Sequence, residues 1–394
     1  MNELVYPRER TLSAITLVLG VLAWIALIAG TFGGALIFLL AGFVAYLFVH
    51  SALISHIKGN GVLLTEAQFP ELHAQFVSCC DRLQLTHRPQ AYVLNGGGAL
   101  NAFATKFLGT QYLVLLSGVV EAMSKHEDGV RFYMGHELGH LRMKHLQGQL
   151  LRWPVLWLPL LGAAYSRARE STCDRHGLAC SSSPTAAAQS LSALSAGSEG
   201  WKNLNLSAYQ KQLEHTSGFW MSFHELTAGY PWLTKRVARV MNQDGSLPRR
   251  NAFAYLLACI VPYAGRLGGA FGLLVLIYIV GVLAAIAIPA YQDYTVRAKL
   301  TLAAAGTQDV RAALTKFYEE KHQVPDSLQA IGVSPRMGNG IQLSLDSKHM
   351  VLTVETPQGA LVFTPRLDSS QHVFWVCAGG EKLRPSQTPP ACRH

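Results

Sequence analysis

Three apolar segments, each of about 20 residues, constrain this chain more than any other feature of its sequence. Residues 11–31 and 33–53 consist almost wholly of apolar side chains, with a short glycine-containing break between them. Residues 268–289 form a third such segment. Because a helix of this length can cross the hydrocarbon core of a bilayer, the sequence predicts an N-terminal transmembrane hairpin and a third transmembrane helix.

The composition agrees with a membrane protein. Only 14% of the residues are charged, whereas soluble domains usually carry about 25%. The net charge of +9 comes from scattered Lys and Arg without a basic run, so we predict no nucleic-acid partner and attribute the excess to cytoplasmic-side positive charge. A cleaved signal peptide is not expected, because the first apolar segment is long and a second follows at once.

Residues 56–250 are predicted to form a soluble α/β domain. Its expected elements are helices at Pro70–Leu85, Glu127–Leu151 and 181–199 and strands at Gln90–Leu94 and Tyr112–Leu116. Residues 150–165 are apolar but hold two prolines, which predicts an interfacial or re-entrant segment, or one packed on the hairpin. Residues 252–264 are shorter than a bilayer crossing requires.

A possible metal site lies in the longest of these helices. Residues 136–140 read His-Glu-Leu-Gly-His, and residues four apart on a helix share one face, so His136 and His140 can bind one ion. Glu137 is then placed to take a proton from a water that the metal acidifies. The motif alone also occurs in unrelated chains, and packed histidines on a buried helix are the alternative.

A catalytic zinc site needs a third protein ligand. The third histidine that some zinc peptidases carry after His140 is missing, which leaves Glu170 as the candidate. Asp174 lies one helical turn after it and is expected to accept a hydrogen bond from a ligand imidazole. Other histidines nearby, including His145, are not expected to be ligands.

These motifs resemble the HtpX and CAAX-prenyl-protease (Ste24p-like) type of zinc metalloendopeptidase, over about residues 60–240. The resemblance implies one Zn²⁺ per chain, bound by His136, His140 and Glu170. Residues 230–237 resemble a late motif of that family, in which Tyr230 stands where a histidine is usual, so that its hydroxyl would have to stabilise the oxyanion. Arg236 is expected to pair with an acid such as Asp174.

A second segment also matches that family. Asn101, Ala102, Phe103 and Ala104 resemble its Asn-Ala-Phe-Ala segment beside the substrate cleft. As an unpaired sheet edge, it would bind a substrate peptide as an added strand. An ordinary turn and edge strand is the alternative.

The C-terminal third resembles a type IV pilin. Residues 277–299 are similar to the pilin N-terminal helix, and four short alternating segments after Ile341 predict an antiparallel sheet. The resemblance implies a disulfide between Cys377 and Cys392. The glycine and glutamate that mark prepilin cleavage are missing, with Gly272 at the glutamate position, so we expect an unprocessed, unpolymerised anchor.

Together these features predict a membrane-anchored α+β protein: a mainly helical peptidase domain with a small sheet, and a pilin-like long helix packed on an antiparallel sheet. The predicted parts are a hairpin (1–55), a zinc peptidase domain (56–250), an interfacial segment with the third span (251–290) and a pilin-like domain (291–394).

The predicted function is zinc-dependent hydrolysis of peptide bonds in membrane or misfolded proteins at the bacterial inner membrane. The catalytic domain would face the cytoplasm and the C-terminal domain the periplasm, where pilus or secretion components are possible partners. If residues 252–264 also crossed, the C-terminal domain would be cytoplasmic. The alternative is a pilin-like assembly or binding protein whose peptidase domain is inactive or secondary. A prenyl-protein processing enzyme fits poorly, because such proteases have many more spans.

Overall fold

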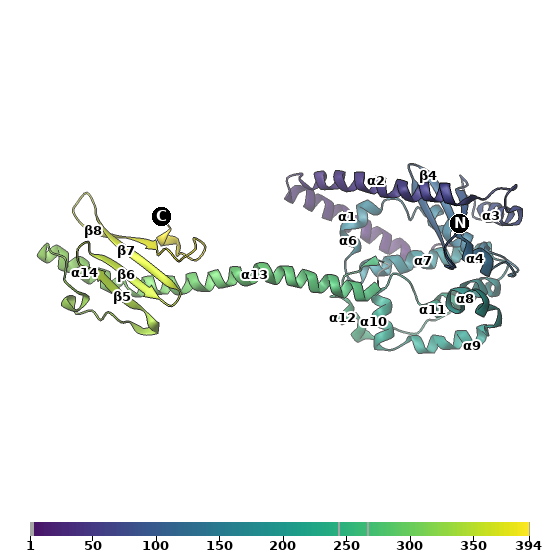
Figure 1. Cartoon of the computed structure of the whole chain (residues 1–394). Helices are drawn as coiled ribbons and strands as arrows, with labels where there is room; N and C mark the ends of the chain where they lie inside the picture. Colours follow the sequence, from purple (N-terminus) through teal and green to yellow (C-terminus); the bar gives the residue numbers. More distant parts are fainter. Residues whose placement is uncertain (1–3, 243–244, 266–267, 394) are drawn as a thin grey trace. The chain divides into compact units, whose positions relative to one another are not determined.

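The computed structural model describes residues 4–242, 245–265 and 268–393. The chain forms two compact units, Met1–Ile277 and Tyr278–His394 (Figure 1). Each of the four predicted domain ranges includes at least one residue outside the described ones, and the division into four parts stays a prediction.

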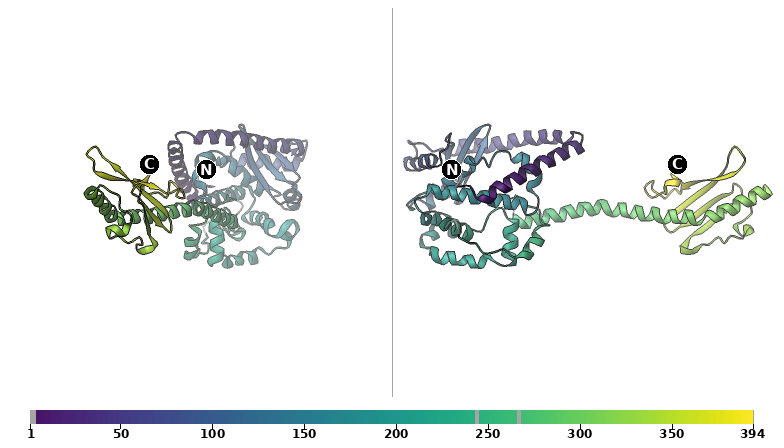
Figure 2. Two further views of the ribbon diagram at one scale, coloured as in Figure 1. Left: turned by 60° about the vertical axis from the view of Figure 1, so that its left-hand side comes forward. Right: turned by 180° about the vertical axis from the view of Figure 1, so that it is seen from behind.

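The first unit begins with a helical hairpin. Helix α1 (Pro7–Gly30) and helix α2 (Ala35–Asn60) are joined by a tight turn in which Gly33 has a φ of +84°, and they diverge from that turn as a V (Figure 2). Both helices are long and apolar enough to cross a membrane, as is the helical stretch Phe271–Lys321. The three predicted spans are therefore confirmed as candidate membrane helices.

A four-stranded sheet follows the hairpin. Its strands are β1 (Val62–Leu63), β2 (Gln90–Leu94), β3 (Ala102–Phe107) and β4 (Thr110–Leu116), in the order β1-β2-β4-β3. Strands β2 and β4 are parallel, and the other neighbours are antiparallel. Among the described residues β3 pairs only with β4, so β3 forms one edge of the sheet.

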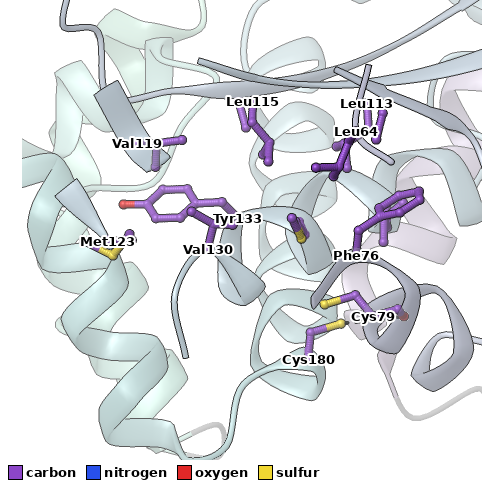
Figure 3. Close-up of a cluster of buried hydrophobic side chains, with 14 of the residues drawn as sticks. Leu64, Phe76, Cys79, Leu113, Leu115, Val119, Met123, Val130, Tyr133 and Cys180 are labelled. Atoms are coloured by element: carbon purple, nitrogen blue, oxygen red, sulfur yellow. Dashed lines mark hydrogen bonds between the residues drawn. The ribbon is translucent and has the colours of Figure 1, made fainter. Parts of the chain in front are cut away.

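Helices pack on this sheet around an apolar core. Leu113 and Leu115 of β4 are fully buried and face Phe76 and Tyr133 from the helices (Figure 3). The α-helices that follow the hairpin up to Ala258 are α3 (Pro70–Arg82), α4 (Ser117–Ala122), α5 (Arg131–Arg142), α6 (Gln149–Leu156), α7 (Leu161–Cys180), α8 (Pro184–Gly200), α9 (Leu206–Lys211), α10 (Phe219–Thr227), α11 (Leu233–Met241) and α12 (Ala252–Ala258).

The prediction of a single helix over Glu127–Leu151 was wrong. Helix α5 ends at Arg142, and the chain turns through left-handed backbone at Lys144 (φ +56°) and Gly148 (φ +67°) before α6 begins. Glycine adopts such a backbone without a steric penalty, which favours a break there. The apolar run thereby becomes the separate helix α6.

The apolar segment 150–165 packs on the hairpin, as one of its three predicted alternatives proposed. The indole Nε1 of Trp24 donates a hydrogen bond of 2.8 Å to the Leu150 carbonyl oxygen. A Cβ atom at Gly20 would lie 2.2 Å from the carbonyl oxygen of Leu151, so only glycine permits this approach of α1 to α6.

The second unit joins a helix to an antiparallel sheet. Helix α13 (Gly268–Gly306), which begins in the first unit, is followed after Thr307 by α14 (Gln308–Lys321). The sheet has the order β5-β6-β7-β8. Its strands are β5 (Gln342–Asp346), β6 (Val351–Thr356), β7 (Gly359–Leu367) and β8 (Val373–Gly379).

The faces of this helix and sheet enclose an apolar core that includes Leu300, Leu314, Val354 and Phe363. Cys377 and Cys392 are joined by a disulfide with a Cα–Cα distance of 4.5 Å. The architecture confirms the predicted fold class, with a mostly helical domain holding a small sheet and a long helix with a four-stranded antiparallel sheet.

Candidate metal centre and active site

The candidate site is built where helices α5 and α7 approach closely. A Cβ atom at Gly139 would lie 2.9 Å from the Cβ of His176, and one at Gly135 would lie 2.7 Å from the His176 carbonyl oxygen. Both positions therefore need glycine, because any side chain would push the helices apart. This contact brings the His136–His140 face of α5 against Glu170 of α7.

The Glu170 carboxylate faces both imidazoles. Its Oε2 lies 3.2 Å from Nε2 of His136, and its Oε1 lies 3.7 Å from Nε2 of His140. Ligands of a tetrahedral zinc ion, each about 2.0–2.2 Å from the metal, stand about 3.3–3.6 Å apart. The three side chains therefore fit the ligand set of one zinc ion.

The electrostatics of the site also favour a cation. Burial alone would raise the pKa of Glu170, but its hydrogen bond with His136 and the positive charge there lower it to about 2. Burial alone would lower the pKa of His136, but hydrogen bonds with Asp174 and Glu170 raise it to about 10. Burial alone would raise the pKa of Asp174, but the positive charge of Arg236 and the hydrogen bond with His136 hold it well below its usual range. Two carboxylates therefore place negative charge beside His136, where a metal ion at Nε2 would be stabilised as the proton is.

Cys173 offers a different third ligand. His136, His140 and Cys173 each have a potential ligating atom within 4.8 Å of the others. Glu170 fits better, because it faces both Nε2 atoms, whereas the Cys173 sulfur lies 3.6 Å from Nδ1 of His145. Burial also raises the pKa of the Cys173 thiol well above its usual range, and only a thiolate is a good zinc ligand.

Asp174 and Arg236 hold the first imidazole in place. Oδ1 of Asp174 lies 3.0 Å from Nδ1 of His136. Arg236 donates two hydrogen bonds to the same carboxylate, from Nε to Oδ2 at 2.9 Å and from Nη2 to Oδ1 at 2.6 Å. Asp174 therefore fixes the tautomer in which Nδ1 of His136 carries the hydrogen and Nε2 is free for a metal. The structure thus brings His136, Asp174 and Arg236 together.

A second chain of contacts ends on His140, and the sequence analysis missed it. Nδ1 of His140 lies 3.1 Å from Nδ1 of His145, and Nε2 of His145 lies 2.7 Å from Oε1 of Glu9. If the Glu9 carboxylate accepts the Nε2 hydrogen, Nδ1 of His145 becomes the acceptor for His140, which again leaves Nε2 of His140 free. The available signal was a lone acid in the first turn of a membrane helix, which is costly without a partner.

One small pocket collects most of the predicted site residues. It has a volume of about 70 Å³, and eight of the residues that line it come from the sequence prediction: Asn101, Ala102, His136, Glu137, His140, Glu170, Tyr230 and Arg236. Asp174 lies behind the first imidazole, and Phe103 and Ala104 belong to the same edge strand, β3, without lining the pocket. The chemical roles of these residues stay predictions.

Comparison with known proteins bears on both units. Residues 66–161 match the model of "Peptidase family M48", a range that contains His136 and His140. The chain is also 32% identical over 134 residues to the fimbrial protein EcpC of Eikenella corrodens, covering 31% of this chain and 86% of that protein. It is 40% identical over 62 residues to the type IV major pilin protein PilE1 of Neisseria gonorrhoeae.

The pilin match is partial, since it covers 16% of this chain and 38% of the gonococcal protein. The chain therefore spans less than half the length of that relative. Among solved structures, S. mikatae Ste24p aligns with a TM-score of 0.37 and 13% identity, over 58% of this chain and 62% of that one. At this TM-score the likeness says nothing about activity.

These matches and the three candidate membrane helices define a membrane protein that carries a peptidase M48-type domain and a fimbrial part. In part of its length the chain belongs with the fimbrial proteins, and residues 66–161 match a peptidase family M48 domain. Both resemblances predicted from the sequence are confirmed at this level.

Proposed function

We propose that this protein is a zinc-dependent endopeptidase that cleaves membrane or misfolded proteins. The observation that carries the proposal is the Glu170 carboxylate, which faces Nε2 of His136 at 3.2 Å and Nε2 of His140 at 3.7 Å. Glu137 and Tyr230 line the same pocket. The match to peptidase family M48 supports the reaction class.

His136, His140 and Glu170 would hold one zinc ion per chain, which would polarise the scissile carbonyl and acidify water when bound. Glu137 follows the first ligand on α5 and takes the proton of the attacking water, which it then passes to the leaving amine. The Tyr230 hydroxyl donates a hydrogen bond to the oxygen on which negative charge develops. Asp174 and Arg236 position His136, and His145 and Glu9 position His140.

The substrate would bind along strand β3. This strand lies at the edge of its sheet, and its first residue, Ala102, lines the pocket together with Asn101. An extended peptide can add to such an edge through backbone hydrogen bonds, which are independent of side-chain identity. Residues 101–104 would therefore select an extended backbone rather than a particular sequence, as suits a protease acting on unfolded segments.

We further propose a location at the bacterial inner membrane, with the peptidase domain in the cytoplasm. The hairpin α1–α2 would return the chain to the side on which it began, and α13 would carry residues 291–394 to the periplasm. The cysteines agree with this topology. Cys377 and Cys392 form the disulfide that an oxidising compartment permits, whereas the five other cysteines are free.

The test uses the full-length chain purified in detergent. We expect about one zinc ion per chain and zinc-dependent cleavage of casein. His136→Ala should lose both metal and activity, whereas Glu137→Gln should keep the metal and lose the activity. Wild-type activity in Glu137→Gln, or a zinc content near zero in the wild-type protein, would refute the proposal.

A second candidate function rests on the fimbrial match, which covers 86% of the Eikenella protein. In this case the chain would be a pilin-like assembly or binding protein, with pilus or secretion components as partners and an inactive or secondary peptidase domain. Recovery of the chain in purified pili, together with unchanged pilus function in Glu137→Gln, would favour it over the peptidase.

A further inference from the structure

A basic cavity lies beside the start of α1, in the first unit. Its volume is about 520 Å³, and the residues that line it do not include His136, His140 or Glu170. Six cationic side chains and one carboxylate line it: Arg8, Arg167, Lys235, Arg239, Arg249, Arg250 and Glu225. The excess of cations over carboxylates makes the cavity positive, which favours binding of an anion.

The single carboxylate, that of Glu225, already forms ion pairs with two of the cations. Oε2 of Glu225 lies 2.6 Å from Nζ of Lys235 and 3.0 Å from Nε of Arg250. Arg8 and Arg249 are exposed, and neither has an ion pair or hydrogen bond to a described residue. These two side chains can reorient toward a ligand without breaking any contact.

The two other arginines make contacts that leave their charge uncompensated. Arg167 is buried and donates hydrogen bonds to the backbone carbonyls of Glu225, at 2.6 Å, and Leu226, at 3.1 Å. Arg239 donates to the hydroxyl groups of Ser171 and Tyr6, at 3.1 and 3.2 Å. Neutral acceptors satisfy the N–H groups but do not cancel the charge, so the cavity stays positive.

An apolar cavity adjoins the basic one. It has a volume of about 340 Å³ and shares six lining residues with its neighbour: Arg8, Leu12, Ala164, Arg167, Arg250 and Tyr255. Leu160, Leu226 and Thr11 complete its wall. A ligand that fills both cavities must carry negative charge at one end and hydrocarbon at the other.

The residues around the two cavities are of the kinds found at the depth of the lipid headgroups. Arg8 belongs to the first turn of α1, and the apolar part of this candidate membrane helix begins at about Leu12. On α12, which contributes Tyr255, the side chains of Phe253 and Leu256 are 72% and 68% exposed. Exposed aromatic and apolar side chains beside basic ones are typical of a membrane interface.

We propose that the two cavities form a binding site for one anionic phospholipid. The phosphate group would lie among Arg8, Arg239 and Arg249, since arginine binds phosphate oxygens through paired N–H groups. An acyl chain would lie along Leu12 and Leu160. Inorganic phosphate shares the headgroup chemistry but cannot fill the apolar cavity. This proposal does not depend on the peptidase activity.

The experiment is native mass spectrometry of the full-length chain in a neutral detergent. The lipids are dioleoyl phosphatidylglycerol and dioleoyl phosphatidylcholine, and inorganic phosphate is a third arm. The test variant is Arg8→Gln/Arg249→Gln. The matched control is Arg88→Gln/Lys144→Gln, which removes two exposed cations that do not line either cavity.

We expect one phosphatidylglycerol per chain at saturation, with much weaker binding of phosphatidylcholine. Since each cation near a lipid surface contributes about fivefold to affinity, the test variant should bind about 25-fold more weakly, and the control should bind as the wild type does. Leu12→Ser provides a second variant, which should weaken phosphatidylglycerol binding without changing any charge.

Three results would overturn the proposal: equal binding of the two lipids, equal losses in the test and control variants, or displacement by millimolar inorganic phosphate together with wild-type lipid binding in Leu12→Ser, which would identify a free-phosphate site instead. Both double variants are first checked for wild-type thermal unfolding without added lipid. If Arg8→Gln/Arg249→Gln does not fold, Leu12→Ser decides the outcome.

Discussion

The two units of this chain are stabilised by different kinds of interior. In the first unit, α5 and α7 enclose ionisable side chains, among them His136, His145, Glu170 and Asp174. In the second unit, the buried polar side chains among residues 278–393 are Thr307 and Thr388. Buried charge is costly unless it is paired, so a fold retains it where chemistry requires it. Under the proposed function, this contrast assigns the reaction to the first unit and a structural role to the second.

The largest expected effect tests the chemical side of this contrast. Glu137→Gln should lower the rate of casein cleavage by about 10²–10⁴-fold, the usual contribution of a general base, with zinc content unchanged. The measurement is the cleavage rate alongside elemental analysis. Glu127→Gln changes an exposed glutamate on the same stretch of chain and should keep wild-type activity. Equal losses in the two variants would contradict the assignment.

The next effect tests the structural side. Cys377→Ser should destabilise the second unit by about 3 kcal/mol, because the disulfide closes a loop of 15 residues and restricts the unfolded chain. Hydrogen exchange should accelerate in β5–β8 and stay unchanged in α5 and α7. Cys259→Ser, which replaces an exposed free cysteine, is the matched control. Faster exchange in α5 would mean that the interiors are not independent.

A smaller effect, on zinc affinity, is expected from changing Asp174, which contacts the metal-ligand candidate His136. Asp174→Asn should weaken zinc binding by about 10–100-fold, because it disturbs both the hydrogen bond to His136 and the ion pair with Arg236. Competition with a chelator measures the affinity. Asp128→Asn alters another buried aspartate, which accepts a hydrogen bond from the Ser182 backbone at 2.7 Å. It should leave the zinc affinity unchanged; a similar loss there would point to general destabilisation.

The smallest effect concerns Glu9. Glu9→Ala should weaken zinc binding by about tenfold, since His145 loses the acceptor that fixes its tautomer. Glu9→Gln keeps an acceptor oxygen and should restore most of the affinity. In Co²⁺-substituted protein, the visible spectrum should change in Glu9→Ala and return in Glu9→Gln. Identical spectra in all three proteins would show that Glu9 does not position His140.

Much of this organisation could be predicted from the sequence because its signals are local. Continuous apolar segments identified the membrane helices, and alternating apolar residues identified the strands of the second unit. The spacing of His136 and His140 follows from the pitch of one helix. The position of Asp174 is also a local signal, because it lies one helical turn beyond Glu170, although its partners His136 and Arg236 are 38 and 62 positions away.

The missed features depend on distant parts of the chain. The break after Arg142 depends on a turn that separates two apolar stretches with the same helical periodicity. The Glu9–His145 contact joins residues 136 positions apart, and no periodicity in a single sequence indicates such a pair. The basic cavity likewise collects residues from α1, α7, α11 and the segment after it.

Glu9 also has a consequence for how the protein is handled in pieces. It belongs to the first turn of a candidate membrane helix, while the imidazole that it supports follows α5. A soluble fragment that begins after α2 would contain His136, Glu137, His140 and Glu170 and would still lack this acid. The zinc affinity and activity of such a fragment would therefore not represent those of the full-length protein. A weak or absent activity in it would report the missing anchor rather than the competence of the motif.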